Sequence, residues 1–243
     1  MFLAIDIGNT NINLGIFQGK RLFKRSFIAT KGYNAKRLKN ALSGYSIDAA
    51  AVCSVVPAVT GVLAADLKRS QGSSIYIIGR DIKVPLKNLY RNPLQVGADR
   101  LINAYAGIKL YGAPLIVVDF GTAITLDVIS RDKEYIGGMI LPGLVISLRA
   151  LSRETALLPR IELSRPGEFI GRDTRNSMLS GIFYGFAAAV DLLSLKIRKK
   201  IGKNTIVVGT GGNIISIARY CKKMNRIDRD LTLKGISLIF RNK

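Results

Sequence analysis

Two short segments place a carboxylate, a glycine and a hydroxyl in the same order. The first is Asp6-Ile7-Gly8-Asn9-Thr10, and the second is Asp119-Phe120-Gly121-Thr122, which begins 113 positions later. Glycine lets the backbone approach a ligand closely, and the N–H groups of such turns bind phosphate without a helix. A single copy is equally compatible with a tight hairpin. Two copies favour a pair of phosphate-binding loops.

The segments that position these loops repeat as well. Apolar runs precede the loops at 2–7 and 115–118, and alternating segments typical of strands follow at 11–17 and 123–129. A charged turn and a third strand complete each copy. Because helices and further strands follow in both halves, the sequence predicts a mixed α/β protein built from two similar lobes.

Periodicity and turn residues predict the remaining elements. Helices are expected at 34–42, 60–68, 98–111, 144–151, 174–199, 214–221 and 230–240, and strands at 49–56, 74–78 and 205–208. Thr60 is expected to cap the second of these helices. The join between the lobes is expected near 95–114, which divides the chain into residues 1–108 and 109–243.

A third motif, Val96-Gly97-Ala98-Asp99-Arg100, opens one of these helices. The positive end of a helix favours an ionised carboxylate, so Asp99 could accept a hydroxyl proton during phosphoryl transfer. Arg100 could hold an anionic group through two parallel hydrogen bonds. A capping aspartate beside a surface arginine is the alternative interpretation.

A glycine-rich turn, Gly209-Thr210-Gly211-Gly212-Asn213, follows a buried strand late in the chain. It resembles the start of GxGxxG, but Ile214 stands where the last glycine belongs, which argues against a Rossmann site. No GxxxxGK[ST] occurs, so a P-loop is also excluded. The turn either passes beneath a nucleoside or simply enters a helix.

Composition excludes several classes of protein. The chain has no histidine, which rules out Ser-His-Asp triads and histidine-bound zinc. Its two cysteines, Cys53 and Cys221, form no CxxC and favour a reducing cytoplasm. We expect no signal peptide and no membrane span. The net charge of +21 suits anionic ligands, and the run 20–39 holds eight basic and no acidic residues.

These motifs together resemble the acetate and sugar kinase, Hsp70 and actin superfamily, and within it the type III pantothenate kinases. The resemblance covers the whole chain. Its other motifs are Tyr90-Arg91-Asn92-Pro93, Ile170-Gly171-Arg172-Asp173-Thr174, Ser180-Gly181 and Asp230-Leu231-Thr232-Leu233-Lys234-Gly235. It implies two ribonuclease-H-like (actin-like ATPase) lobes with mixed β-sheets and a nucleotide cleft between them.

The resemblance also implies an activity and a set of site residues. ATP would phosphorylate pantothenate to 4′-phosphopantothenate, the first step toward coenzyme A, with Asp99 as the general base. The residues implied to bind ATP and its phosphates are Asp6, Ile7, Gly8, Asn9, Thr10, Gly121, Thr122, Gly211 and Gly212. Those implied to hold pantothenate are Tyr90, Gly97, Ala98, Arg100 and Thr174. Asp119 matches a K⁺ or NH₄⁺ site, and Asp6 would serve Mg²⁺ through phosphates or water.

A homodimer with its pantothenate pocket at the interface is implied too, and the apolar helix containing Gly181 and Gly185 suits either that interface or an internal core. The sequence departs from the family pattern at Arg172-Asp173, where Lys-Asn is expected, and at Asn213. No specific nucleic acid is expected as a partner.

Two other functions stay open. One is a nucleic-acid-binding regulatory protein built on the same fold, which the basic surface motivates and which predicts sequence preference above background. The other is a different kinase or sugar-phosphate enzyme of the superfamily, which Val96–Arg100 would distinguish. A nuclease with two metals needs a larger carboxylate cluster than Asp6, Asp99 and Asp119 provide.

Overall fold

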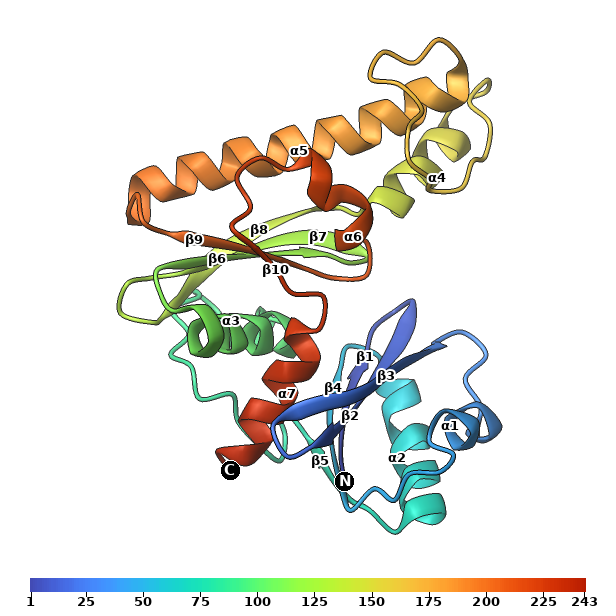
Figure 1. Cartoon of the computed structure of the whole chain (residues 1–243), viewed down its shortest axis with the longest axis vertical. Helices are drawn as coiled ribbons and strands as arrows, with labels where there is room; N and C mark the ends of the chain where they lie inside the picture. Colours follow the sequence, from blue (N-terminus) through green and yellow to red (C-terminus); the bar gives the residue numbers. More distant parts are fainter. The chain divides into compact units, whose positions relative to one another are not determined.

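The computed structural model describes residues 1–243, which form two compact units (Figure 1). The first unit comprises residues 1–87, 91–109 and 231–243, and the second comprises residues 88–90 and 110–230. Each unit contains one five-stranded mixed sheet.

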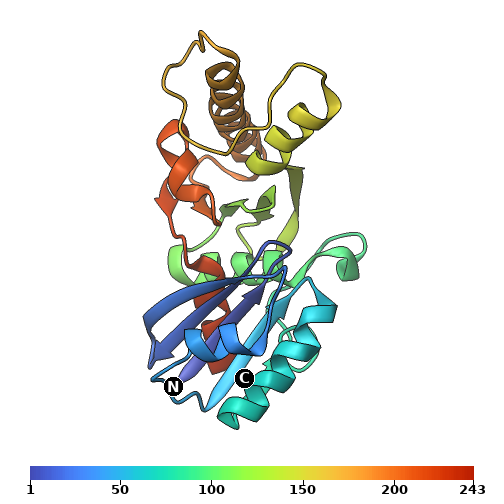
Figure 2. The same ribbon diagram turned by 90° about the vertical axis from the view of Figure 1, so that its right-hand side faces the viewer.

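The sheet of the first unit has the order β3-β2-β1-β4-β5. Its strands are β1 (Phe2–Ile7), β2 (Asn11–Gln18), β3 (Arg21–Ala29), β4 (Ala49–Ser54) and β5 (Ser74–Ile77). β1 pairs antiparallel with β2 and parallel with β4. Alternate side chains of β1, such as Leu3 and Ile5, join a core on the face where Figure 2 shows helices α1 (Ala35–Ala41) and α2 (Pro57–Gln71).

The opposite face of this sheet packs against α3 (Ala98–Tyr111) and α7 (Leu231–Arg241). Cys53 from β4 lies there with Ile102 of α3 and Ile236 of α7. The expected division at 108/109 assigned the last helix to the second lobe. In the structure α7 contacts β1, β2 and β4, because its buried apolar face completes the first core.

The sheet of the second unit has the order β10-β9-β6-β7-β8. Its strands are β6 (Leu115–Phe120), β7 (Ala123–Ile129), β8 (Tyr135–Pro142), β9 (Ile206–Thr210) and β10 (Arg226–Ile227). The helices of this unit are α4 (Leu144–Glu154), α5 (Thr174–Ile201) and α6 (Ile214–Ile217), and the 3₁₀ turn η2 (Ala218–Tyr220) follows α6. The other 3₁₀ turn, η1 (Pro93–Gln95), belongs to the first unit. The apolar face of β6 and β7 packs against α4, α5 and α6.

The two sheets confirm the predicted repeat. If the strands of each unit are numbered in chain order, the first sheet has the order 3-2-1-4-5. The second sheet, read from β8 to β10, has the same order. β1 and β6 are the equivalent central strands, and each runs directly into one of the two predicted loops.

Two local predictions need correction. The helix expected to begin at Thr60 begins at Pro57, because proline is well suited to the first helical position. Thr60 instead lies inside the helix, where its hydroxyl donates to the carbonyl of Val56 at 3.0 Å. The helix expected at 214–221 is only four residues long, and the 3₁₀ turn η2 follows it.

The long helix α5 has an 18-residue window with mean hydropathy 1.6, so by length and composition alone it could cross a membrane. Within that window 44% is buried in the structure. Leu179, Phe183 and Val190 recur along one side and join the core beneath the second sheet. Figure 1 shows α5 running along this sheet, and we describe it as the core helix of the second unit.

Candidate active site

The first predicted loop connects β1 to β2, and hydrogen bonds hold its backbone in place. The Gly8 N–H donates to the Asn11 carbonyl at 2.9 Å. Thr30 braces the loop from the end of β3, since its hydroxyl donates to the Gly8 carbonyl at 2.7 Å and its N–H to the Thr10 carbonyl at 3.0 Å. The loop is therefore ordered before any ligand binds.

The predicted residues of this loop differ in what they can offer. Asn9 and Thr10 are both exposed to solvent. The side chain of Ile7 is fully buried in the core of the first unit. Ile7 can therefore contribute only through its backbone.

Asp6 lies on the face of the first sheet that α3 and α7 cover. Asn13 on β2 and Cys53 on β4 are its neighbours in register, so all three side chains share this face. The Asn13 amide donates to the Asp6 carboxylate at 3.0 Å. The pKa of Asp6 is raised to about 6: burial is the largest cause, the hydrogen bond from Asn13 lowers the pKa, and the charge of Asp99 raises it. Asp6 and Asp99 thus lie within electrostatic reach of each other.

The same two carboxylates affect the pKa of the Cys53 thiol. Burial raises its pKa well above the usual range, and Asp6 and then Asp99 raise it further. The thiol therefore stays protonated beneath a pair of acidic groups. Two carboxylates that act on each other electrostatically favour a bound cation or a shared proton.

Asp99 is held at the start of α3 by its own helix. Its Oδ1 accepts the N–H of Arg100 at 2.9 Å. A Cβ atom placed on Gly97 would lie 2.4 Å from this same oxygen, so the absence of a side chain at 97 gives the carboxylate its room. Buried Val96 anchors the segment, while Asp99 and Arg100 stay partly exposed. Asp6 and Asp99 both belong to the first unit, and the charge of Asp99 acts on Asp6.

The second predicted loop connects β6 to β7 and leaves Thr122 exposed. Gly143, the residue before α4, packs directly on this loop: a Cβ atom there would lie 2.0 Å from the Thr122 carbonyl oxygen. Sequence reasoning did not assign this role to Gly143, although Pro142-Gly143 marks the start of α4.

The late glycine turn also contacts the second loop. A Cβ atom on Gly211 would lie 2.3 Å from Oδ1 of Asp119, and the residue has φ +97°, a conformation that favours glycine. The Asn213 N–H donates to the Phe120 carbonyl at 3.0 Å. Gly212 differs, since nothing lies within 4 Å of its Cβ position. The asparagine that departs from the family pattern adds a side-chain contact, since the Asn213 amide donates to the Gly121 carbonyl at 3.5 Å.

Thr210 is a candidate site residue that the sequence did not reveal. It pairs in register with Asp119 across β9 and β6, so both side chains lie on one face of the second sheet. The Thr210 hydroxyl is buried and has no hydrogen-bond partner. An unpaired buried hydroxyl is unfavourable, which makes this oxygen a candidate ligand beside a carboxylate.

Tyr90 lies against β8 of the second unit. The Leu89 N–H donates to the Tyr135 carbonyl at 2.8 Å, and the Tyr90 and Tyr135 rings are 6.4 Å apart. The predicted pantothenate residues are thus divided, with Gly97–Arg100 in the first unit and Tyr90 and Thr174 in the second.

Thr174 is the first residue of α5 and is exposed. Asp173 caps the helix, since its carboxylate accepts the Asn176 N–H at 2.8 Å and the Asn176 amide at 2.7 Å. Oδ1 of Asn176 accepts the Gly167 N–H at 3.1 Å. This network presents Thr174 on a well-defined helix terminus.

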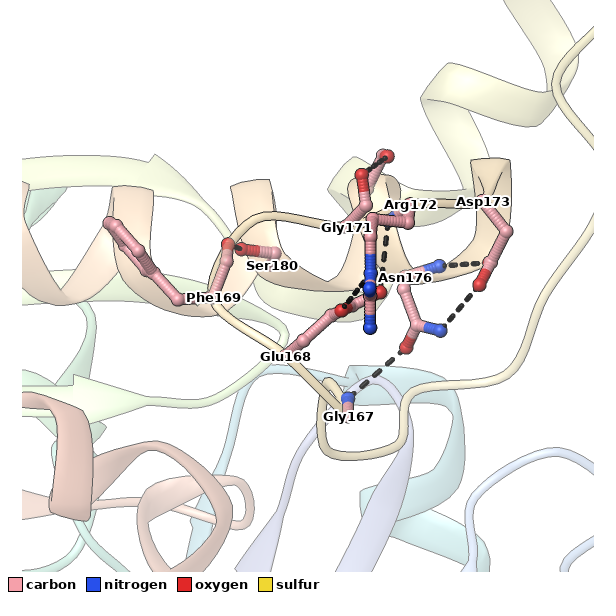
Figure 3. Close-up of polar contacts among 9 residues, drawn as sticks. Gly167, Glu168, Phe169, Gly171, Arg172, Asp173, Asn176 and Ser180 are labelled. Atoms are coloured by element: carbon pink, nitrogen blue, oxygen red, sulfur yellow. Dashed lines mark hydrogen bonds and ion pairs between the residues drawn. The ribbon is translucent and has the colours of Figure 1, made fainter.

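The loop before Asp173 folds tightly against α5 (Figure 3). A Cβ atom on Gly171 would lie 2.2 Å from the Ser177 nitrogen, so only glycine fits. Arg172 pairs with Glu168 at 2.8 Å. The two charged residues that depart from the family pattern therefore have local partners, as an ion pair and as a helix cap.

Solved structures support the fold. A Campylobacter jejuni protein assigned to the Baf family of transcriptional activators is 21% identical, with TM-score 0.57 and coverage of 99% of this chain and 97% of that one. A Listeria monocytogenes protein assigned as an N-acetylmannosamine kinase is 14% identical, with TM-score 0.54 and coverage of 99% and 98%. The chain therefore shares its fold with these two proteins.

Sequence comparisons identify the family. Proteins named type III pantothenate kinase from Geobacter sulfurreducens and Moorella thermoacetica are each 40% identical to this chain, over 99% of its length and 98% of theirs. The family model for type III pantothenate kinase matches residues 2–196, which include both repeated loops, Val96–Arg100 and Thr174. The chain belongs to the type III pantothenate kinases.

Proposed function

We propose that this protein transfers the γ-phosphoryl group of ATP to the primary hydroxyl of pantothenate, with Asp99 as the general base. The observation that carries the assignment is the position of Asp99 at the start of α3, in the space left by Gly97 and within electrostatic reach of Asp6. The product is 4′-phosphopantothenate, and the step opens coenzyme A biosynthesis. We place the reaction in the cytoplasm.

Each predicted group has a part in this reaction. The Asp99 carboxylate accepts the hydroxyl proton as the pantothenate oxygen attacks the γ-phosphorus, and ADP leaves with the electrons of the broken P–O bond. Backbone N–H groups of the two loops, with Thr10 and Thr122, bind the phosphates. Arg100 pairs with the pantothenate carboxylate, and Tyr90 and Thr174 complete the pantothenate site.

The donor sets fit the expected ions. Asp6 offers a hard carboxylate oxygen beside a second carboxylate, which suits Mg²⁺ held through phosphates or water. Asp119 and the partnerless Thr210 hydroxyl share one face of the second sheet, which suits K⁺ or NH₄⁺. Bound there, the ions supply positive charge that neutralises the transferring phosphoryl group.

We also propose that the protein is a homodimer that uses the outward side of α5. Gly181, Gly185, Ala188, Leu192 and Leu195 recur every three or four positions and are all exposed in the single chain. Nothing lies within 4 Å of the Cβ positions of Gly181 and Gly185, so a second helix could approach closely. An interface there would place Thr174, at the start of the same helix, beside the partner.

A coupled assay of ADP release tests the kinase. Wild-type protein is supplied with ATP, Mg²⁺ and pantothenate in K⁺, NH₄⁺ or Na⁺ buffer, beside Asp99→Asn and the matched control Asp132→Asn on an exposed turn. We expect pantothenate-dependent turnover that requires K⁺ or NH₄⁺, and a loss of about 10²–10⁴-fold in Asp99→Asn alone. Folded protein without pantothenate-dependent turnover in any buffer would contradict the proposal.

A second candidate function rests on β3. This edge strand exposes Phe27 by 67% and Phe23 by 51% among basic residues such as Arg25, a combination that single-stranded nucleic acids can contact by stacking and charge. Titration of labelled oligonucleotides at several salt concentrations distinguishes a specific site from the attraction of a net charge of +21. Affinities that do not depend on sequence would leave the kinase as the sole function.

A further inference from the structure

A basic cavity of about 630 Å³ lies within the second unit, at the amino-terminal end of β9. Its walls come from the end of α3, the last turn of α5, the connection into β9 and the start of β10. Arg198, Lys203 and Arg226 line it, and no aspartate or glutamate does.

The Arg198 side chain is held rigidly in this wall. Its Nε donates to the Thr205 carbonyl at 3.0 Å, and Nη2 donates to Oδ1 of Asn225. Asn225 is itself fixed, since the same oxygen accepts the Val207 N–H at 2.9 Å. Both acceptors are neutral, so the guanidinium is oriented while its charge is not neutralised. A preorganised fork of this kind suits bidentate contact with a phosphate.

The other two cations are Arg226 and Lys203, and only Arg226 is oriented by a hydrogen bond, which it donates to a neutral group. Arg226 donates through Nη1 to the Asn225 carbonyl at 2.9 Å, and Lys203 is exposed. None of the three cations forms an ion pair with a carboxylate in the structure. Three like charges around one cavity repel one another, and an anion bound among them would relieve this repulsion.

The rest of the wall has a polar part, made by Asn204, Thr205 and Asn225, and an apolar and aromatic part. Leu110, Ile206 and the ring of Tyr111 contribute to it, and the Tyr111 hydroxyl is already engaged by Asp228 at 2.8 Å. A ligand that fills the cavity would therefore combine an anionic group with an apolar or aromatic moiety, in the manner of small-molecule sites generally.

This cavity is separate from the loops of the kinase site. It touches Ile206, the first residue of β9, whereas the Gly211-Gly212 turn follows the last residue of that strand. At about 3.3 Å per residue, the five residues of β9 separate the two by roughly 15 Å.

We propose that the cavity is a second ligand site, which binds a small phosphate-bearing molecule with an apolar or aromatic moiety. The oriented Arg198 fork, with Lys203 and Arg226, holds the phosphate, and the Tyr111 wall packs against the remainder. The site is independent of the proposed phosphoryl transfer and does not rest on it.

Calorimetric titration with AMP tests the site, with a non-hydrolysable ATP analogue, Mg²⁺ and pantothenate already saturating the kinase site. We compare the double variant Lys203→Gln/Arg226→Gln with Lys20→Gln/Lys31→Gln, which changes the net charge equally at exposed positions of the first unit. Both pairs are exposed, so both variants are expected to fold, and circular dichroism verifies this.

We expect AMP to bind wild type and the Lys20/Lys31 variant equally, and the Lys203/Arg226 variant at least about tenfold more weakly. Inorganic phosphate, titrated in the same way, is expected to bind wild type more weakly than AMP does. Equal weakening in both double variants would attribute binding to net charge and overturn the proposal. The same holds if AMP does not bind, or binds no tighter than phosphate.

Discussion

The adjacent glycines of the late turn provide a sharp test of the second loop. Gly211 has φ +97°, and a Cβ atom there would lie 2.3 Å from Asp119 Oδ1 and 2.7 Å from the Phe120 backbone. Gly212 has open space around its Cβ position and no left-handed backbone. We predict that Gly211→Ala damages the protein and that Gly212→Ala does not.

The magnitude follows from two costs. A left-handed backbone at alanine costs about 1–2 kcal/mol, and forcing a methyl group into an occupied site costs about 1–3 kcal/mol. Gly211→Ala should therefore lower the free energy of unfolding by about 2–5 kcal/mol. Gly212→Ala should stay within about 0.5 kcal/mol of wild type, as surface substitutions usually do.

Urea denaturation of both variants measures the difference, and the ADP-release assay shows its effect on the site. Because the displaced atom is a carboxylate oxygen of Asp119, Gly211→Ala should also need more K⁺ for half-maximal activity. Equal stability and equal K⁺ dependence of the two variants would refute the close packing of the turn on Asp119.

Three further substitutions test other parts of the site. Gly97→Ala should change the free energy of unfolding little, because the new methyl group meets an atom of the movable Asp99 side chain. It should lower kcat at least about tenfold, because it displaces the Asp99 carboxylate that serves as the base. An unchanged kcat would argue against the placement of Asp99 as the base. Asp6→Asn should stabilise the metal-free protein by at most about 3 kcal/mol at pH 8 and not at all below pH 4. The pKa of Asp6 is raised to about 6 in the folded protein, so the stability of the wild-type protein is lost as the pH rises through 6. Urea denaturation across this pH range measures the difference in stability, and a difference that does not change with pH would contradict the prediction. Thr210→Val should stabilise the protein by about 1 kcal/mol, because it removes a buried hydroxyl that has no hydrogen-bond partner. The same substitution should raise the K⁺ concentration that gives half-maximal turnover. An unchanged K⁺ dependence would show that Thr210 is not part of the cation site.

The internal repeat made the architecture predictable. Asp6 and Asp119 mark equivalent strand ends, and the spacing of apolar runs around them was sufficient to anticipate two equivalent sheets. The preferences of single residues predicted the ends of helices less well where two residues favoured different starting points. Pro57 and Thr60 are both favourable residues near the start of a helix. Pro57 occupies the first helical position, so the N-cap is Val56, four residues before the predicted cap at Thr60.

The missed site residues depend on contacts between distant strands. Thr210 and Asn213 became relevant only because β9 lies beside β6, which brings positions about ninety residues apart into register. Asn13 is a different case: it lies opposite Asp6 in the adjoining strand β2, and only the register of that hairpin reveals its contact with Asp6. A sequence pattern states which residues alternate or turn, but not which buried strand becomes the neighbour of which.

The position of α7 has a consequence for how the protein is made. This helix completes the core of the first unit, yet residues 110–230, which form most of the second unit, are translated before it. Until then, the apolar face beneath β1 and β4 lacks Leu233 and Ile236 while the chain is still on the ribosome. The first unit therefore cannot complete its core until the last helix has been made, although its synthesis starts first.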